Sequence, residues 1–397
     1  MERGLQVLLL TIFVAMLGLG IVGPIMPLYA QTFGATYIQI GLLSSAWSIS
    51  RFIFSAPAGR LSDSTGKKKV IVGGLLVYSV VSLLYTFAWD FNSLLFFRFI
   101  HGLGSAMASP VAMAYAAELA PKGQEGKYMG TMTLAMFGGM GVGPFIGGTL
   151  TDAFSLSAPF YVMCALTAVS LAFTTVFLPE TQPIDPTHSK PRPSFRKVLS
   201  NKMLLASFMY RAVNSLGNSS IMGFLSLFMA STVLDGGLGL TATDAGTVLS
   251  VGQIIGAILQ RPSGTLADRH DKKKLIMLGG CVSALGMASF AFSHTFWEVM
   301  LARIIFAAGS ALITPAISSI AAIEGRELGI GTTMSVLESA MSLGMMVGPL
   351  LSGVLADALS LKPIFYVGSA ISFIGVGVFW ALLRGHKELE ATSTDIF

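Results

Sequence analysis

A single acidic side chain lies deep inside one of the long apolar stretches of the chain. Glu338 stands within residues 330–354, which we expect to form one helix. At about 1.5 Å per residue, its carboxyl group lies roughly 12 Å from the start of that helix. Removal from water favours the neutral form of a carboxyl group, so Glu338 could bind and release a proton or bind a cation. The alternative is a static ion pair with an arginine.

Basic side chains interrupt other apolar stretches. His101 titrates near neutral pH when unperturbed and could join a proton relay with Glu338, or it could be a hydrogen-bonded packing residue. Arg51 and Arg211 could bind an anionic group or pair with Glu118. They could equally extend their charged ends toward water.

Uncharged polar residues in the same stretches could contact a small molecule. Asn214, Asn218 and Gln253 could donate hydrogen bonds to a substrate, or they could simply link helices. Met26 offers an adaptable apolar contact, although methionine is also a common packing residue. We include all four among the candidate substrate-binding residues, with Arg51 and Arg211.

The composition states which elements must position these residues. Of the 397 residues, 53% are hydrophobic and 11% are charged, whereas a soluble globular chain is about a quarter charged. Apolar runs long enough to cross a hydrocarbon layer of about 30 Å recur along the whole chain. The expected fold class is therefore an all-α membrane protein with twelve transmembrane helices. Our approximate spans are 5–29, 37–57, 70–88, 93–118, 128–150, 158–178, 203–230, 242–262, 275–293, 297–320, 330–354 and 362–383.

The distribution of basic residues orients the chain and argues against nucleic-acid binding. Twenty of the 25 Lys and Arg residues lie in segments or helix ends on one side of the expected membrane, and only Lys362 lies on the other. Positive residues favour the cytoplasmic side, so we expect both termini in the cytoplasm of a cell whose inner (plasma) membrane holds the protein. The first apolar run lacks a cleavage signal and is expected to remain as a helix.

The chain repeats itself at an offset of 205 residues. Residues 41–75 and 246–280 share 13 identities in 35 positions, and residues 134–153 and 339–358 share 11 in 20. Because each repeat has an even number of spans, both repeats begin on the same side of the membrane and are parallel repeats. We expect an N-terminal six-helix bundle over 1–178, a proline-rich cytoplasmic linker over 179–202, and a C-terminal six-helix bundle with a short tail over 203–397.

Comparison of the two repeats separates residues that belong to the shared scaffold from residues that could take part in chemistry. Arg98 and Arg303 match each other, whereas Glu338 faces Thr133 and His101 faces Phe306. Charges present in only one repeat are better candidates for substrate or proton binding. Cys164 and Cys281 have the spacing of neither a disulfide framework nor a metal site, and we expect no metal and no cofactor.

Two basic loops occupy equivalent positions in the repeats. The first runs from Gly59 through Asp63 and Gly66 to Lys67–Lys69, and the second runs from Gly264 through Asp268 to Lys272–Lys274. Glycine permits a close helix end, the acid could lie near a neighbouring helix N-terminus, and the lysines are expected in the cytosol.

These loops resemble the signature loop of the major facilitator superfamily, and the resemblance extends over essentially the whole chain. It implies the major facilitator fold, with two pseudo-symmetric six-helix halves. It also implies a conformational latch between the halves, which we assign to the two aspartates and their neighbours. The latch residues are Gly59, Asp63, Gly66, Lys67, Glu118, Gly264, Asp268 and Lys272. Ser64 and Asp271 depart from the usual Arg and Gly of this signature.

Two further motifs are similar to those of the twelve-helix drug/proton antiporter branch. Arg98, in a helix that resembles the fourth of the family, is implied to take part in proton transfer with His101 and Glu338. The segment after Met136 resembles the antiporter signature, through Gly139, Gly143, Pro144, Gly147 and Gly148. Unlike many drug exporters of this branch, the first span carries no acid.

The resemblance implies a secondary transporter that exports small amphipathic or drug-like molecules in exchange for protons, as a monomer in the lipid bilayer. Transport of an organic anion or another small metabolite is the first alternative, and a non-transporting membrane receptor is a remote one. The chain has no phosphate-binding Walker loop and no hydrolase motif, so we expect neither ATP-driven transport nor an enzyme.

Overall fold

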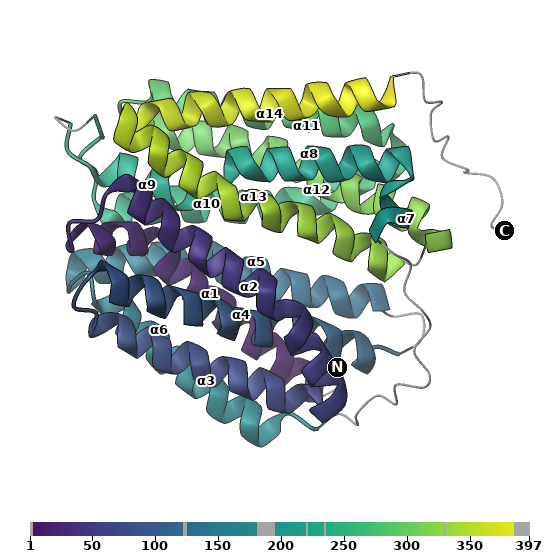
Figure 1. Ribbon diagram of the computed structural model, residues 1–397, viewed down its shortest axis with the longest axis horizontal. Coiled ribbons are helices and arrows are strands. Elements are labelled where there is room, and N and C mark those ends of the chain that lie inside the picture. The colour runs from purple at the N-terminus through teal and green to yellow at the C-terminus, as the bar shows by residue number, and fades with distance from the viewer. Residues whose placement is uncertain are drawn as a thin grey trace. The chain divides into compact units, whose positions relative to one another are not determined.

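Helices make up the regular secondary structure of the computed structural model, which describes residues 3–121, 125–180, 195–219, 221–233, 236–328 and 330–384 (Figure 1). They are α1 (Arg3–Gln31), α2 (Tyr37–Thr65), α3 (Lys67–Thr86), α4 (Phe91–Leu119), α5 (Glu125–Ala153), α6 (Ala158–Phe177), α7 (Phe195–Leu199), α8 (Lys202–Asn218), α9 (Ile221–Ala230), α10 (Ala242–Arg269), α11 (Lys272–Phe292), α12 (Phe296–Leu328), α13 (Ile330–Ala358) and α14 (Lys362–Leu383).

Ten of the described helices are individually long and apolar enough to cross a membrane. The remaining two spans of the twelve-helix fold are α2 and the pair α8–α9. α2 has 29 residues, but Arg51, Arg60 and Asp63 make it more polar than its neighbours. The expected seventh span, 203–230, corresponds to α8 and α9, and residue 220 between them lies outside the described residues.

The chain forms two compact units. Unit 1 contains residues 1–189 together with 221–254 and 349–361, and unit 2 contains the rest. Both α10 and α13 therefore contribute one end to each unit. The division that we expect at 179–202 stays a prediction, and residues 181–194 of that segment, like the tail after residue 384, lie outside the described residues.

Local sequence sets the helix starts. Thr36 accepts a hydrogen bond from the backbone N–H of Gln39, whose side chain in turn accepts from the N–H of Thr36, which forms a capping box for α2. Asp90 and Ser93 form the same arrangement at α4. Gly66 joins α2 to α3 with a φ of 96°, a conformation that a residue with a Cβ rarely adopts.

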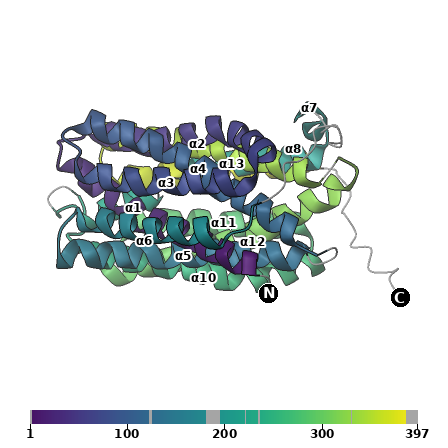
Figure 2. The same ribbon diagram turned by 90° about the horizontal axis from the view of Figure 1, so that it is seen from below.

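In unit 1, α1 packs against α5 and α6, and α4 packs against α2 and α3 (Figures 1 and 2). Small residues make these contacts close. A Cβ added to Gly74 would lie 2.9 Å from the carbonyl oxygen of Gly104, and one added to Gly102 would lie 2.7 Å from the Cβ of Ser50. In lipid, such close backbone approach supplies much of the attraction between helices.

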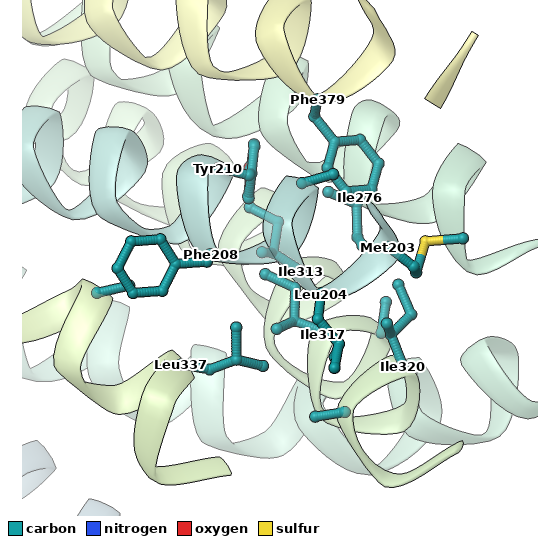
Figure 3. Packing of buried hydrophobic residues seen from close by; sticks show 14 of the residues in the cluster. Met203, Leu204, Phe208, Tyr210, Ile276, Ile313, Ile317, Ile320, Leu337 and Phe379 are labelled. Carbon is teal, nitrogen blue, oxygen red and sulfur yellow. The ribbon is translucent and has the colours of Figure 1, made fainter. Parts of the chain in front are cut away.

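In unit 2, a cluster of buried apolar side chains joins α8, α11, α12, α13 and α14 (Figure 3). Leu204 and Tyr210 of α8 lie in it with Ile276 of α11 and Phe379 of α14, all fully buried. Val198 of α7 is also fully buried in this cluster, so this short helix contacts protein through that side chain.

Candidate functional site

The deep carboxylate of the sequence is paired in unit 2. Nη2 of Arg211, on α8, lies 2.5 Å from Oε1 of Glu338, on α13. The Arg211 side chain is 17% exposed and that of Glu338 is 57% exposed, so the carboxylate remains open to a solute while the guanidinium is largely enclosed. Glu338 therefore has the arginine partner of the second interpretation, and its binding of a proton or cation stays a prediction.

The depth of Glu338 distinguishes it from the other acids whose side chains the structure describes. Each of the others lies outside a helix or within about one turn of a helix end. Glu338 lies more than two turns inside α13. Its neighbours include Ser342, whose hydroxyl donates to the Glu338 carbonyl, and the Met341 sulfur, which lies 3.8 Å from Nη2 of Arg211.

A row of amide side chains runs along α8 from the Arg211 level. Nδ2 of Asn218 donates to Oδ1 of Asn214 at 2.9 Å, and Nδ2 of Asn214 lies 3.5 Å from the Tyr210 hydroxyl. The Ser372 hydroxyl of α14 reaches Oδ1 of Asn218 at 3.5 Å. Asn214 and Asn218 are half-buried, so the row both links helices and leaves polar surface for a ligand.

Arg98 and His101 lie together in a buried group of unit 1. Nη1 of Arg98 is 3.5 Å from Nδ1 of His101, which also lies 2.9 Å from the Tyr85 hydroxyl. A guanidinium can only donate, so the contact with Arg98 requires Nδ1 of His101 to accept. His101 is completely buried and its Nε2 has no hydrogen-bond partner in the described part of the chain.

The Tyr85–His101 pair of this group is specific to the first repeat. Tyr85 and His101 correspond to Phe290 and Phe306 in the second repeat, where the two phenyl rings lie 6.5 Å apart. The apolar version shows that the fold does not require the polar pair. The interpretation of His101 as a proton carrier stays a prediction. Because the side chain of His101 is enclosed, water would have to reach it in another conformation of the protein.

Arg51 and Arg98 both lie against the ring of Trp47. Their guanidinium carbons are 5.4 Å and 5.9 Å from the ring centroid. Such contacts stabilise a cation by about 0.5–2 kcal/mol. Arg51 does not reach Glu118, which pairs with another residue, and the described part of the chain shows no acidic partner for either arginine.

The remaining candidate contacts lie in unit 1. Gln253 is half-buried on α10 and takes part in an interaction of its own. Met26 is 2% exposed between Pro24 and Pro27 of α1. In this arrangement Met26 acts as a packing residue, and a role in substrate contact stays a prediction.

The first of the two basic loops, residues 59–69, is organised around a buried lysine. Nζ of Lys67 lies 3.0 Å from Glu118 and 4.0 Å from Asp63, and its side chain is 4% exposed. The side chain of Lys67 is thus enclosed by protein, and the expectation that the lysines of this loop lie in the cytosol stays a prediction. The positive φ of Gly66 turns the chain so that α3 begins with Lys67 directed back toward α2 and α4. Gly59 has open space around it.

Loss of the Lys67 ammonium is expected to destabilise the protein. Lys67→Ala leaves two carboxylates without their shared partner, and a hydrogen bond to a charged group contributes about 1.5–3 kcal/mol. Thermal unfolding in detergent measures the effect. Lys69→Ala, two residues further on and exposed, is the matched control. Equal losses in both variants would show that Lys67 and its partners do not hold the loop.

The second loop differs in detail. Lys272 is also buried, at 8% exposure, whereas Asp268 is exposed. Asp271, which departs from the glycine of the family signature, accepts the backbone N–H of Lys273 and so caps α11. A Cβ added to Gly264 would lie 4.0 Å from the Cβ of Pro315, which is ordinary contact. The departure from the signature thus replaces the positive-φ glycine of the first loop, Gly66, by a side chain that caps the helix.

The glycines of the antiporter motif pack α5 onto α1. A Cβ added to Gly143 would lie 2.6 Å from the Cα of Gly20, and Gly139 and Gly147 likewise face the backbone of α1 more closely than a Cβ permits. Pro144 lies inside α5. Gly148 faces a different helix, with the backbone of Ala242 in α10 beside it. The motif therefore builds two helix contacts.

Two aspartates with specific contacts were not among the sequence candidates. Asp152 ends α5 and Asp357 ends α13, and each accepts backbone hydrogen bonds from the start of another helix. They stand 205 residues apart, so they occupy the same position in the two repeats. That coincidence was present in the sequence, because both lie in the segment with 11 identities in 20.

The chain matches the model of the Major Facilitator Superfamily twice, over residues 8–224 and 208–395. It is 33% identical over 384 residues to an uncharacterised MFS-type transporter of Methanocaldococcus jannaschii, covering 95% of this chain and 97% of the relative. It is 27% identical over 379 residues to the quinolone resistance protein NorA of Staphylococcus aureus, with 95% of each chain covered.

Solved structures of membrane transporters share the fold. A bacterial homologue of the human lysosomal transporter Spinster, in an inward-facing and occupied conformation, superposes with a TM-score of 0.80 at 14% identity, over 96% of each chain. With its repeated family match, its helices and its duplicated motifs, the chain belongs to the Major Facilitator Superfamily: it is a multi-pass membrane transporter with the twelve-helix fold, and not an enzyme.

Proposed function

We propose that this transporter exports small amphipathic molecules in exchange for protons, with both termini in the cytoplasm and the plasma membrane as its site. The observation that carries the proposal is the Arg211–Glu338 pair. An accessible carboxylate deep in a spanning helix can exchange its arginine partner for a proton as its surroundings change, which is the elementary step of coupling.

Further support comes from the close contact of the antiporter motif with α1 and from the names of the relatives. Gly139, Gly143 and Gly147 line one helix contact. The related NorA is named for quinolone resistance. The row formed by Tyr210, Asn214 and Asn218 beside the ion pair offers hydrogen bonds, and Met341 offers an adaptable apolar contact.

Transport in reconstituted vesicles tests the proposal. A panel of amphipathic cations and organic acids is offered to vesicles with an imposed pH gradient. One pH unit is worth about 1.4 kcal/mol per proton, so one-for-one exchange accumulates a substrate about tenfold. Equal accumulation of substrate with and without the pH gradient would contradict proton coupling. Absence of flux for the whole panel would favour a receptor role.

Transport of organic anions is the second candidate. Arg51 and Arg98 both contact Trp47, and neither has an acidic partner in the described part of the chain. A carboxylate of a substrate could balance this charge. Preferential flux of the organic acids, together with its loss in Arg51→Gln, would favour this candidate over export of cations.

A further inference from the structure

Two aspartates of unit 1 connect helices of opposite repeats. Asp357, at the end of α13, accepts the backbone N–H groups of Tyr37 at 2.9 Å and Ile38 at 2.8 Å, at the start of α2. Asp152, at the end of α5, accepts those of Ala242 at 3.2 Å and Thr243 at 2.7 Å, at the start of α10. These residues belong to the same compact unit.

The accepted N–H groups are the ones that each helix leaves free. The first four N–H groups of a helix have no partner within it. Thr36 already accepts the N–H of Gln39 in α2, and Thr241 accepts the N–H of Asp244 in α10. The aspartates therefore fill the first two N–H groups of each helix, where a negative charge is also favoured by the helix dipole.

Glycines bring the same helix pairs into backbone contact. A Cβ added to Gly41 of α2 would lie 2.8 Å from the carbonyl carbon of Pro349 in α13. One added to Gly246 of α10 would lie 2.9 Å from the carbonyl carbon of Pro144 in α5. Gly41 and Pro144 stand 205 residues before Gly246 and Pro349, so the two contacts are copies of each other.

We propose that Asp152 and Asp357 are gate residues of the transport cycle, which hold this end of the helices closed on the extracytoplasmic side. The inference rests on the proposed function, because these residues can act as a gate only if the helix ends separate during the transport cycle. Separation exposes four backbone N–H groups to water and breaks both glycine contacts. The two carboxylates set how often that happens.

The two sides of the gate are not equally strong. The Ser250 hydroxyl of α10 accepts the backbone N–H of Phe145 in α5 at 2.9 Å. Its counterpart in α2, Ser45, is fully buried, and its hydroxyl has no partner in the described part of the chain. The α5–α10 side thus has an additional hydrogen bond, and removal of Asp357 should open the gate more than removal of Asp152.

Labelling of a reporter cysteine tests the gate. Cys164 and Cys281 are first replaced by Ala, and Ser45→Cys places one thiol a turn deeper than Gly41 on the same helix face. A membrane-impermeant maleimide is then added to intact cells. Asp357→Asn and Asp152→Asn are expected to raise the labelling rate, by about fivefold for Asp357→Asn, the size of the loss of one helix cap. Asp357→Glu, which retains a carboxylate, is expected to restore most of the protection.

The matched control is Asp90→Asn. Asp90 lies in the turn after α3 and caps its own helix, α4, without connecting two spans. Its substitution should leave labelling unchanged. Equal labelling in all variants, or an equal rise in Asp90→Asn, would overturn the proposal, and so would labelling that occurs only in inverted vesicles. The assay needs no substrate, so it can succeed even where the vesicle flux experiment contradicts proton-coupled export.

Discussion

Replacement of Glu338 by Gln is expected to abolish the substrate accumulation that a pH gradient drives. Gln has the same shape and can still accept a hydrogen bond from Arg211, so the helix contact remains. It cannot lose or gain a proton. One-for-one exchange at a gradient of one pH unit accumulates substrate about tenfold in the parent protein, and the variant should show no accumulation above equilibration.

The control for this variant is Glu298→Gln. Glu298 lies in the first turn of α12 and is also a glutamate in a spanning helix, but it lies near the helix end and accepts the backbone N–H of His294. It should keep the full pH-driven accumulation. Normal accumulation by Glu338→Gln would remove Glu338 from proton coupling, and His101 would then become the next candidate to test.

The second large effect is expected when a substitution adds one methyl group at the contact between α1 and α5. In Gly143→Ala the new Cβ would lie 2.6 Å from the Cα of Gly20, and no side-chain rotation relieves a contact between backbones. Overpacking of this kind costs about 1–3 kcal/mol. We expect a lower unfolding temperature and a loss of transport, because α1 and α5 must separate slightly along their whole contact.

Gly138→Ala, five residues earlier in the same helix, is the matched variant. Its Cβ would lie 3.5 Å from the ring of Phe13, which is ordinary contact. Alanine also favours a helix over glycine by about 1 kcal/mol. The two variants should therefore change the unfolding temperature in opposite directions, and a shared direction would show that the close approach of Gly143 does not decide the packing.

Hydropathy and length predicted most helices because a span must be both apolar and about 20 residues long. The expected span 158–178 is α6, Ala158–Phe177. The contact by which Ser219 joins α8 to α13 escaped prediction because it depends on tertiary structure. The Ser219 hydroxyl donates to the carbonyl groups of Leu216 and Gly344. No local sequence pattern predicts the bond to Gly344, which lies on another helix.

The sequence likewise identified the charged residues of the site better than it predicted which residues pair with each other. Glu338 and Arg211 were both candidates from the sequence, yet their pairing depends on how α8 lies against α13. Lys67 was expected on the cytosolic side, but the sequence did not predict that two acids, from α2 and α4, would pair with its ammonium group. The gate aspartates, in contrast, could have been found by asking which acids recur at the repeat offset.

The enclosure of Lys67 gives neighbouring lysines of one loop unequal reactivity toward reagents that attack amines. Lys69 is exposed, whereas the Lys67 side chain is 4% exposed and its ammonium group lies beside two carboxylates. An acylating reagent in water therefore reaches Lys69 first, although both residues belong to the same run of three lysines.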